Sequence, residues 1–483
     1  MAKEEKKIYV YENWSAITPR LMGLLYVSES RGSEVYSFEY NEDYLRSAPP
    51  ITIDPDLELY SGRQYVYKKP NFGIFSDSAP DRWGRTLMDR RERLRAKEEG
   101  RKPRALLTSD YLLGVYDESR MGALRFALEE GGPFLSSDGE ETVPPWATLR
   151  SLEEASREFE KDENALNDTW LKQLLRPGSS LGGARPKATI QNVDGSLWIA
   201  KFPSRHDKTN VGAWEKVVNE AARICGLRVP ESRLETFSSL GSTFLVKRFD
   251  REGDRRIHFS SAMTMLNKTD GASADDGTSY LELADFLSTH GARPKEDLAE
   301  LWKRIVFNIA ISNTDDHLRN HGFLLTPSGW VLSPAYDLNP QPDGNGLALN
   351  ISLEDNTLDI HLALEVSQYF QLGKNEAAEM AQNLCQLING SWESIAKGCG
   401  LNRGRLSLCD PLSMPADGDI SSAGKPPLPS GSLSCSALPT LVRCLRPDID
   451  HPGRSSRITE KEEATPQGGL LLVSTLVFSN YQN

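Results

Sequence analysis

An aspartate and an asparagine five residues apart, Asp315 and Asn320, have the spacing that phosphoryl transfer uses. In a D-x-x-x-x-N loop the aspartate takes the proton of the attacking hydroxyl, and the asparagine binds Mg²⁺ through its side-chain oxygen. The segment 313–320 reads NTDDHLRN and follows directly on an apolar helical stretch. Two carboxylates, a histidine and an amide in that place favour a catalytic loop. A polar loop that only caps the helix is the alternative.

A second acidic position follows at Asp337, within the segment SPAYDLNP of residues 333–340. Between it and Asn320 the chain reads GFLL, a Thr-Pro-Ser-Gly turn and WVLS, which predicts a short hairpin. A catalytic loop, a hairpin and then an aspartate is the order that brings an amide and a carboxylate to one Mg²⁺. Taken alone, Asp337 is equally suited to capping a turn.

A glycine-rich segment, SSLGGARPK, occupies residues 179–187. Gly182 and Gly183 allow backbone N–H groups to approach a phosphate closely, and Arg185 and Lys187 supply compensating charge. The spacing is not that of a Walker A motif, and an ordinary glycine turn is the alternative.

The residues after this loop predict two strands, 187–192 and 196–202, around an Asp-Gly turn. Lys201 lies in the second strand within the apolar run WIAKFP, where an ammonium needs an anion such as a phosphate. The next segment, 211–225, predicts a helix that carries Glu220, and a strand lysine paired with a helix glutamate is a kinase arrangement. An edge strand that faces water and an ordinary exposed glutamate are the alternatives.

The surrounding elements are readable from periodicity. KKIYVYENW and SEVYSFEY predict strands near the N-terminus, and a helix is expected over residues 80–97, within a stretch rich in arginine. That basic helix is interpreted as a solvated face, with a partner or nucleic-acid surface as the alternative. Residues 294–312 carry one apolar stripe at three- and four-residue steps, which predicts a buried helix.

Bulk properties limit the classes of function. The chain has 483 residues, enough for two or three domains, and its formal net charge of −12 argues against broad non-specific nucleic-acid binding. No secretion signal is recognised and no apolar run is long enough to span a membrane, so a cytoplasmic protein is expected. None of the six cysteines forms a C-x-x-C pair, which makes a zinc site improbable.

These motifs resemble the HipA family of bacterial serine/threonine kinase toxins. The resemblance covers roughly residues 8–400 and is carried by FGIFSDSAPDRWGR, SSLGGARPK, IAKFP, NEAARICGLRVP, VKRFDR, TDDHLRN and PAYDLNP. It implies an α+β, protein-kinase-like two-lobed fold with a β-rich N-terminal part and a mainly helical C-terminal lobe. The predicted divisions are an N-terminal subdomain (1–105), an N-lobe with the glycine-rich loop (106–250), a C-lobe with the catalytic loop (251–400) and a flexible or atypical tail (401–483).

The resemblance also implies a role for each matching residue. Asp315 becomes the catalytic base, and Asn320 and Asp337 become the Mg²⁺ ligands. Ser180 falls where the family carries an autophosphorylated serine, and about two added negative charges there would repel ATP and act as an off switch. The remaining ATP contacts that the resemblance implies are Gly182, Gly183, Ala184, Arg185, Lys187 and Lys201, the backbone of Lys247, Arg248 and Phe249, and His317 and Tyr336.

Family members act with a small helix-turn-helix antitoxin that binds operator DNA. The resemblance therefore implies a HipB-like partner, contact with DNA only through that partner, and a protein substrate, with a translation-related protein as the expectation. Two other functions stay open: a small-molecule phosphotransferase with the same fold, and a non-catalytic scaffold that helps an antitoxin to repress its promoter.

Overall fold

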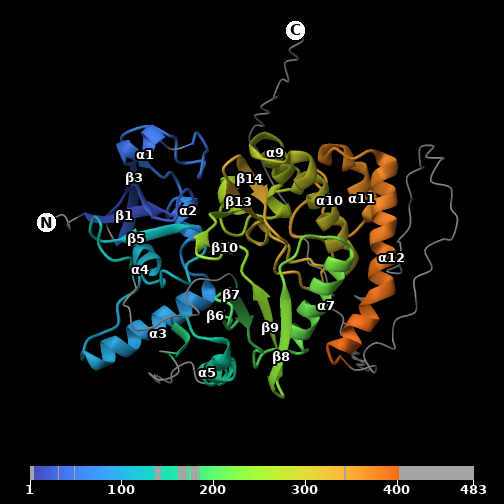
Figure 1. The fold of residues 1–483 in the computed structure, drawn as a ribbon, viewed down its shortest axis with the longest axis horizontal. Coiled ribbons are helices and arrows are strands. Elements are labelled where there is room, and N and C mark those ends of the chain that lie inside the picture. Colours follow the sequence, from blue (N-terminus) through green and yellow to red (C-terminus); the bar gives the residue numbers. More distant parts are fainter. Residues whose placement is uncertain are drawn as a thin grey trace, which may run out of the picture. The chain divides into compact units, whose positions relative to one another are not determined.

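The fold begins with a five-stranded antiparallel sheet in the order β4-β3-β2-β1-β5 (Figure 1). The computed structural model describes residues 5–30, 32–47, 49–135, 143–161, 171, 173–175, 183, 185–341 and 344–401. The strands of this sheet are β1 Lys6–Glu12, β2 Arg20–Ser30, β3 Ser33–Tyr40, β4 Arg63–Tyr65 and β5 Leu124–Ala127. Strands β1 and β3 were predicted from their aromatic and valine content, whereas β2 between them was not.

Four helices belong to this N-terminal region: α1 Glu42–Ser47, α2 Gly73–Asp77, α3 Arg82–Glu98 and α4 Thr108–Leu113. Helix α3 confirms the helix expected over residues 80–97. Asp81 caps its N-terminus, because a carboxylate oxygen accepts the backbone N–H of Gly84 at 2.8 Å. The buried face of α3 carries Trp83 and Leu87, and its arginines lie mostly on the opposite side.

A second antiparallel sheet, in the order β6-β7-β9-β8, follows. Its strands are β6 Lys187–Gln191, β7 Leu197–Lys201, β8 Ser232–Ser238 and β9 Gly241–Lys247, with η1 Trp146–Thr148, α5 Leu149–Lys161 and α7 Val211–Ile224 beside them. The predicted hairpin is confirmed, and Gly195 adopts the positive φ of +82° that its turn requires. Helix α7 packs against β9 and α5 against β6, so both cover this sheet.

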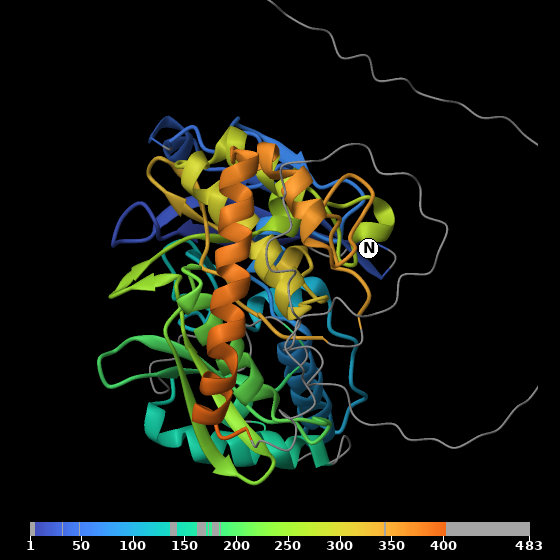
Figure 2. The ribbon, with the colours of Figure 1, turned by 90° about the vertical axis from the view of Figure 1, so that its right-hand side faces the viewer.

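The rest of the described chain is mainly helical, as expected. Its elements are β10 Arg251–Glu252, β11 Arg255–Arg256, β12 Phe259–Ser261, α8 Ala262–Met265, η2 Ala274–Asp276, α9 Tyr280–His290, α10 Pro294–Ile311, η3 Leu318–Asn320, β13 Gly322–Thr326, β14 Gly329–Leu332, α11 Ile360–Glu365, η4 Ser367–Phe370 and α12 Lys374–Gly398. Helix α10 is central, because α9, α11 and α12 all contact it. Figure 2 shows the long α12 in orange, which also packs along α7.

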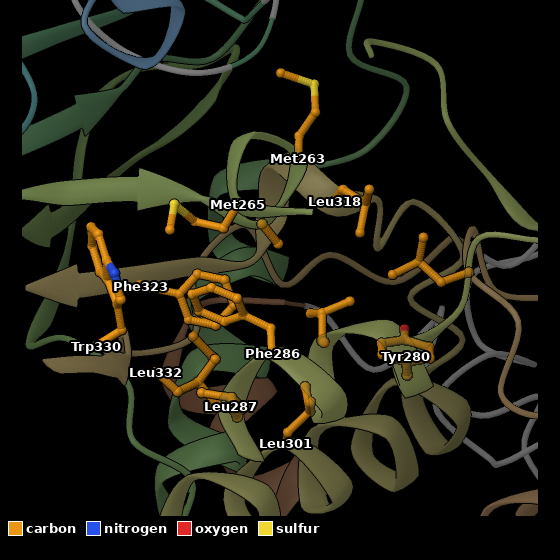
Figure 3. Close-up of a cluster of buried hydrophobic side chains, with 14 of the residues drawn as sticks. Met263, Met265, Tyr280, Phe286, Leu287, Leu301, Leu318, Phe323, Trp330 and Leu332 are labelled. Atoms are coloured by element: carbon orange, nitrogen blue, oxygen red, sulfur yellow. The ribbon is translucent and has the colours of Figure 1, made fainter. Parts of the chain in front are cut away.

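Two buried apolar clusters hold these elements together. The larger one includes the residues around α9, α10 and the β13–β14 hairpin, where Leu318 of the predicted catalytic loop is buried beside them (Figure 3). The smaller cluster joins Trp83 and Leu87 of α3 to Ala188 and Trp198 of the second sheet. Helix α3 of the N-terminal region therefore shares a hydrophobic core with the sheet that carries the glycine-rich loop.

These elements confirm the α+β class. Every described residue lies in one compact unit, Met1–Arg446, and the second unit, Pro447–Asn483, is outside the described residues. The divisions expected near residues 105, 250 and 400 stay predictions. Within the described part of the chain, no helix has both the length and the apolarity needed to cross a bilayer.

Candidate active site

Two lysines stand side by side at the start of the second sheet. Lys187 on β6 pairs directly with Lys201 on β7 in the antiparallel register. Residues that pair in this way place their side chains on the same face of a sheet, at a separation of about 5 Å between their Cβ atoms. The hairpin therefore presents two ammonium groups to one side, as a phosphate-binding surface requires.

Lys201 bridges two carboxylates. Its side chain is 12% exposed, and its ammonium contacts both Glu215 of α7 and Asp337. Burial by itself would lower the pKa of Lys201, but the two carboxylates outweigh that effect and raise it. For Asp337 burial acts in the raising direction, and Lys201 with Lys187 outweighs it, so the pKa of Asp337 lies below its usual value. Asp337 is consequently an ionised carboxylate beside two cations.

The prediction that Glu220 pairs with Lys201 is wrong. Glu220 pairs instead with Lys216 one helical turn away, at 2.5 Å, and Glu215 is the partner of Lys201. Five residues separate the two glutamates, which turns the side chain by about 140° around the helix axis. Glu215 faces the sheet and is buried, whereas Glu220 lies on a face that is partly open to solvent. The sequence placed the glutamate on the correct helix but on the wrong face.

The segment predicted as a catalytic loop begins where α10 ends. Ser312 ends the helix with a positive φ of +51°, and the side chain of Asp315 is exposed three residues later. The side-chain N–H₂ of Asn320 donates to the carbonyl oxygen of Asp315 at 2.8 Å. Because the amide nitrogen of Asn320 is used in this way, its Oδ1 atom is the one that remains to face a cation. One hydrogen bond thus fixes the spacing between the two predicted catalytic residues.

Asp316, the neighbour of Asp315, has a different position that the sequence did not reveal. Its side chain is 2% exposed. One carboxylate oxygen accepts hydrogen bonds from the Tyr280 hydroxyl at 2.5 Å and the Asn308 amide at 2.5 Å, and contacts His321 Nε2 at 2.8 Å. These partners come from α9, α10 and the residue that directly precedes β13. Asp316 therefore anchors the loop from inside while Asp315 faces outward.

The β13–β14 hairpin returns the chain to this loop and brings Asp337 with it. The hydroxyl of Tyr336 donates to the carbonyl oxygen of Arg319 at 2.8 Å, which places the residue before Asp337 against the residue before Asn320. Asp337 itself has a left-handed φ of +55°, a conformation that aspartate tolerates better than most residues. The Tyr336 ring lies 5.7 Å from that of Phe249.

The other predicted nucleotide contacts near the glycine-rich loop have different positions. The side chain of Arg185 forms a bidentate pair with Asp207 at 2.7 and 2.6 Å, and its contact with ATP stays a prediction. Lys187 is 3% exposed, and its positive charge helps to lower the pKa of Asp337. Ser180, Gly182 and Ala184 lie outside the described residues.

The segment predicted to contact adenine is held by hydrogen bonds of its backbone and of one side chain. The backbone N–H groups of Lys247 and Arg248 donate to carbonyl oxygens of Glu231 and Leu197, so Phe249 has the remaining candidate N–H. The guanidinium of Arg248 is buried and donates to Ser119 O at 2.7 Å and Arg120 O at 3.1 Å, as well as to Asp250. Its side chain therefore anchors the segment to the N-terminal region and does not reach a nucleotide.

The residues present fit a nucleotide with Mg²⁺. Within the described ranges no group of three acidic, histidine or cysteine side chains forms a ready metal cage. Mg²⁺ does not need one, because it is commonly held by one or two protein oxygens together with phosphates and water. Asp337 offers an ionised carboxylate and Asn320 an amide oxygen. His317 Nδ1 and Asn339 Oδ1 are buried polar atoms without a hydrogen-bond partner among the described residues, as expected of groups that face a ligand.

The fold and this arrangement of residues define a protein with a kinase-like fold. The family model described as HipA-like C-terminal domain matches residues 179–392. These residues match the HipA-like C-terminal domain, so the predicted resemblance to the HipA family is confirmed over this part of the chain. The glycine-rich loop, both lysines and the loop from Asp315 to Asn320 all fall within the match.

Two relatives and one solved structure are also similar to this chain. A Sinorhizobium fredii protein named "Putative kinase Y4mE" is 30% identical over 183 residues, which cover 33% of this chain and 41% of that protein. A second protein of that organism, named "Putative kinase Y4dM", is 30% identical over 228 residues, 42% of this chain and 53% of its own length. The chain thus matches about half the length of these relatives. The HipA toxin of Shewanella oneidensis MR-1, solved in a complex with HipB and operator DNA, is 17% identical and superposes with a TM-score of 0.58 over 80% of this chain and 90% of that chain.

Proposed function

We propose that this protein is an ATP- and Mg²⁺-dependent serine/threonine protein kinase that acts as the growth-arresting toxin of a toxin–antitoxin pair. The observation that carries the proposal is the contact of Lys201 with both Glu215 and Asp337. A buried lysine between a helix glutamate and the aspartate after the hairpin is the arrangement that protein kinases use to hold ATP phosphates. The matching relatives carry names that describe kinases.

The residues of the site have separate tasks in this reaction. Lys201 and Lys187 neutralise the phosphates, and Glu215 keeps Lys201 extended toward them. Asp337 and Asn320 Oδ1 would hold the Mg²⁺, which when bound neutralises charge on the transferred phosphoryl group. Asp315 is exposed beside Asn320 and accepts the proton of the serine or threonine hydroxyl.

Control of the activity involves Ser180 and a partner. Phosphorylation of Ser180 would add about two negative charges beside the glycine-rich loop, which would repel ATP and switch the kinase off. We propose that a HipB-like helix-turn-helix antitoxin neutralises the kinase and carries it to operator DNA, as the Shewanella complex of HipA, HipB and DNA suggests by analogy. The site of action would be the cytoplasm, with a protein substrate.

The proposal is tested by incubating the purified protein with labelled ATP and Mg²⁺. Label should appear on Ser180 and on a protein in a bacterial extract. Asp315→Asn should abolish labelling, because the amide does not accept the hydroxyl proton. Asp285→Asn is the matched control, since Asp285 is an exposed aspartate on α9, and this variant should label like the wild type.

Expression in bacteria tests the toxin role separately. The wild type should arrest growth, Asp315→Asn should not, and co-expression of the antitoxin should relieve the arrest. Label found only on a sugar or an antibiotic would point to a small-molecule phosphotransferase. Equal effects of the wild type and Asp315→Asn on growth would contradict toxicity by phosphotransfer and favour a scaffold.

A further inference from the structure

The two lysines of the β6–β7 hairpin pose an electrostatic problem. Lys187 and Lys201 pair in register, and like charges directly opposite each other destabilise a sheet. Each ammonium is also nearly buried, with 3% and 12% of its side chain exposed. A buried charge requires a partner. Lys201 obtains its partner, Glu215, from the helix that packs on the same sheet.

The partner of Lys187 comes from a distant part of the chain. A carboxylate oxygen of Asp81 lies 3.2 Å from the Lys187 ammonium, across a sequence separation of 106 residues. The side chain of Asp81 is 4% exposed, so both members of the pair are buried. Asp81 is also the N-cap of α3, and its other carboxylate oxygen accepts the Gly84 N–H. Its position is therefore fixed by the helix as well as by the lysine.

Two more hydrogen bonds join the first turn of α3 to the glycine-rich loop. The indole N–H of Trp83 donates to the carbonyl oxygen of Lys187 at 3.0 Å. The backbone N–H of Trp83 donates to the carbonyl oxygen of Gly183 at 3.3 Å. Trp83 packs in the same buried cluster as Ala188 of β6. The start of α3 thus contacts the loop at both ends of the segment 183–187.

We propose that Asp81 is a positioning residue of the nucleotide site, with the same task for Lys187 that Glu215 has for Lys201. The N-terminal helix then forms part of the phosphate-binding surface, although it lies outside the matched residues 179–392. Asp81 does not touch the nucleotide in this arrangement; it holds the lysine that does. The role of Asp81 in nucleotide binding rests on the proposed function. The contacts by which α3 holds the glycine-rich loop in place do not depend on that function.

The substitution Asp81→Asn isolates the charge. Asparagine is as good an N-cap as aspartate, so α3 keeps its first hydrogen bond while the ion pair is lost. Asp89→Asn is the matched control, because Asp89 lies on the same helix and bonds the Tyr111 hydroxyl, away from the loop. Lys187→Met removes the other partner of the pair.

Two measurements are made on each variant. The first is the dissociation constant for MgATP together with the turnover number. Asp81→Asn should raise the dissociation constant about tenfold, the loss expected for a charge-assisted contact, and change turnover much less. The double variant with Lys187→Met should be no weaker than Lys187→Met alone. The second is amide hydrogen exchange at residues 183, 185, 187 and 188 without nucleotide, which should be faster in Asp81→Asn and unchanged in Asp89→Asn.

The outcomes separate the two proposals. A wild type that binds MgATP, with Asp81→Asn binding equally or more tightly, overturns the role of Asp81 alone. A wild type that does not bind MgATP overturns the proposed function, and amide exchange then decides whether Asp81 holds the loop. Unchanged exchange in Asp81→Asn overturns the hold, whatever the nucleotide result.

Discussion

Replacing Glu215 by glutamine tests which carboxylate supports Lys201. The substitution keeps the shape of the side chain and removes its charge, leaving Asp337 as the charged partner of a buried ammonium. A charge-assisted hydrogen bond contributes roughly 1.5–3 kcal/mol, whereas a completely abandoned buried charge costs about 3–5 kcal/mol. Because Asp337 remains, we expect the lower range. That range corresponds to a fall in kcat/KM of about 10- to 160-fold.

The neighbouring substitution Glu220→Gln provides the contrast. Glu220 pairs with Lys216, which keeps hydrogen bonds to Ser232 O at 2.8 Å and Ser232 Oγ at 3.0 Å after the change. A partly exposed pair of this kind contributes about 0–1 kcal/mol. Glu220→Gln should therefore alter kcat/KM by less than about fivefold. The same substitution at two positions of α7, five residues apart, is thus expected to have a large effect on kcat/KM at one position and a small effect at the other.

A second readout follows from the shared lysine. When Glu215 is neutral, the ammonium of Lys201 has Asp337 as its remaining carboxylate and competes more strongly for it. Glu215→Gln should therefore raise the Mg²⁺ concentration at half-maximal rate, and Glu220→Gln should not. Initial rates of ATP-dependent labelling across both ATP and Mg²⁺ concentrations measure these effects, with thermal unfolding as a check on folding. Equal impairment of the two variants, or none in Glu215→Gln, would refute this assignment.

Three other predictions concern buried or partly buried groups. Asp316→Asn should lower the free energy of unfolding in urea by about 3–5 kcal/mol, because it breaks the hydrogen bonds of a buried carboxylate to three partners. Asp315→Asn should change the free energy of unfolding by less than about 0.5 kcal/mol. Equal stabilities of the two variants would contradict this network. Burial lowers the pKa of His258 from 6.5 to about 3, so between these values the unfolded chain binds a proton that the folded chain does not, and stability falls as the pH falls below about 6.5. His258→Phe should remove about 1.4 kcal/mol per pH unit of that dependence, and an unchanged urea midpoint profile from pH 7 to 5 would argue against it. Partial burial raises the pKa of the Cys225 thiol from 9.0 to about 12, so a smaller fraction of it is thiolate in the folded protein. Peptide mapping after iodoacetamide treatment should show alkylation roughly a thousandfold slower in the folded than in the unfolded protein, and comparable rates would contradict the raised pKa.

Local patterns in the sequence determined most of the elements around the site. The apolar stripe of α10, the Asp-Gly turn of the β6–β7 hairpin and the aromatic strands β1 and β3 depend on neighbours within a few residues. Such signals need no knowledge of distant contacts. The order of Lys201, Asp315, Asn320 and Asp337 along the chain likewise predicted that they form one site. The catalytic role of that site stays a prediction.

The tertiary structure decided which of several similar residues faces the site. Glu215 and Glu220 lie on one helix, and only the packing of α7 against β9 and α12 fixes the rotation that turns Glu215 toward Lys201. Asp315 and Asp316 are adjacent and chemically identical, and burial beneath α9 and α10 separates them. Such rotations depend on surfaces that meet only after folding.

The contact between Asp81 and Lys187 illustrates the same limit at longer range. The helix expected over residues 80–97 included Asp81, whereas in the structure Asp81 is the N-cap of α3. Its second role, as the partner of a lysine 106 residues later, depends on α3 and β6 sharing a hydrophobic core. Local patterns determined the types and order of the chemical groups in this protein. Their pairing was decided by the packing of segments far apart in the chain, because a side chain's direction and its burial are properties of the assembled core.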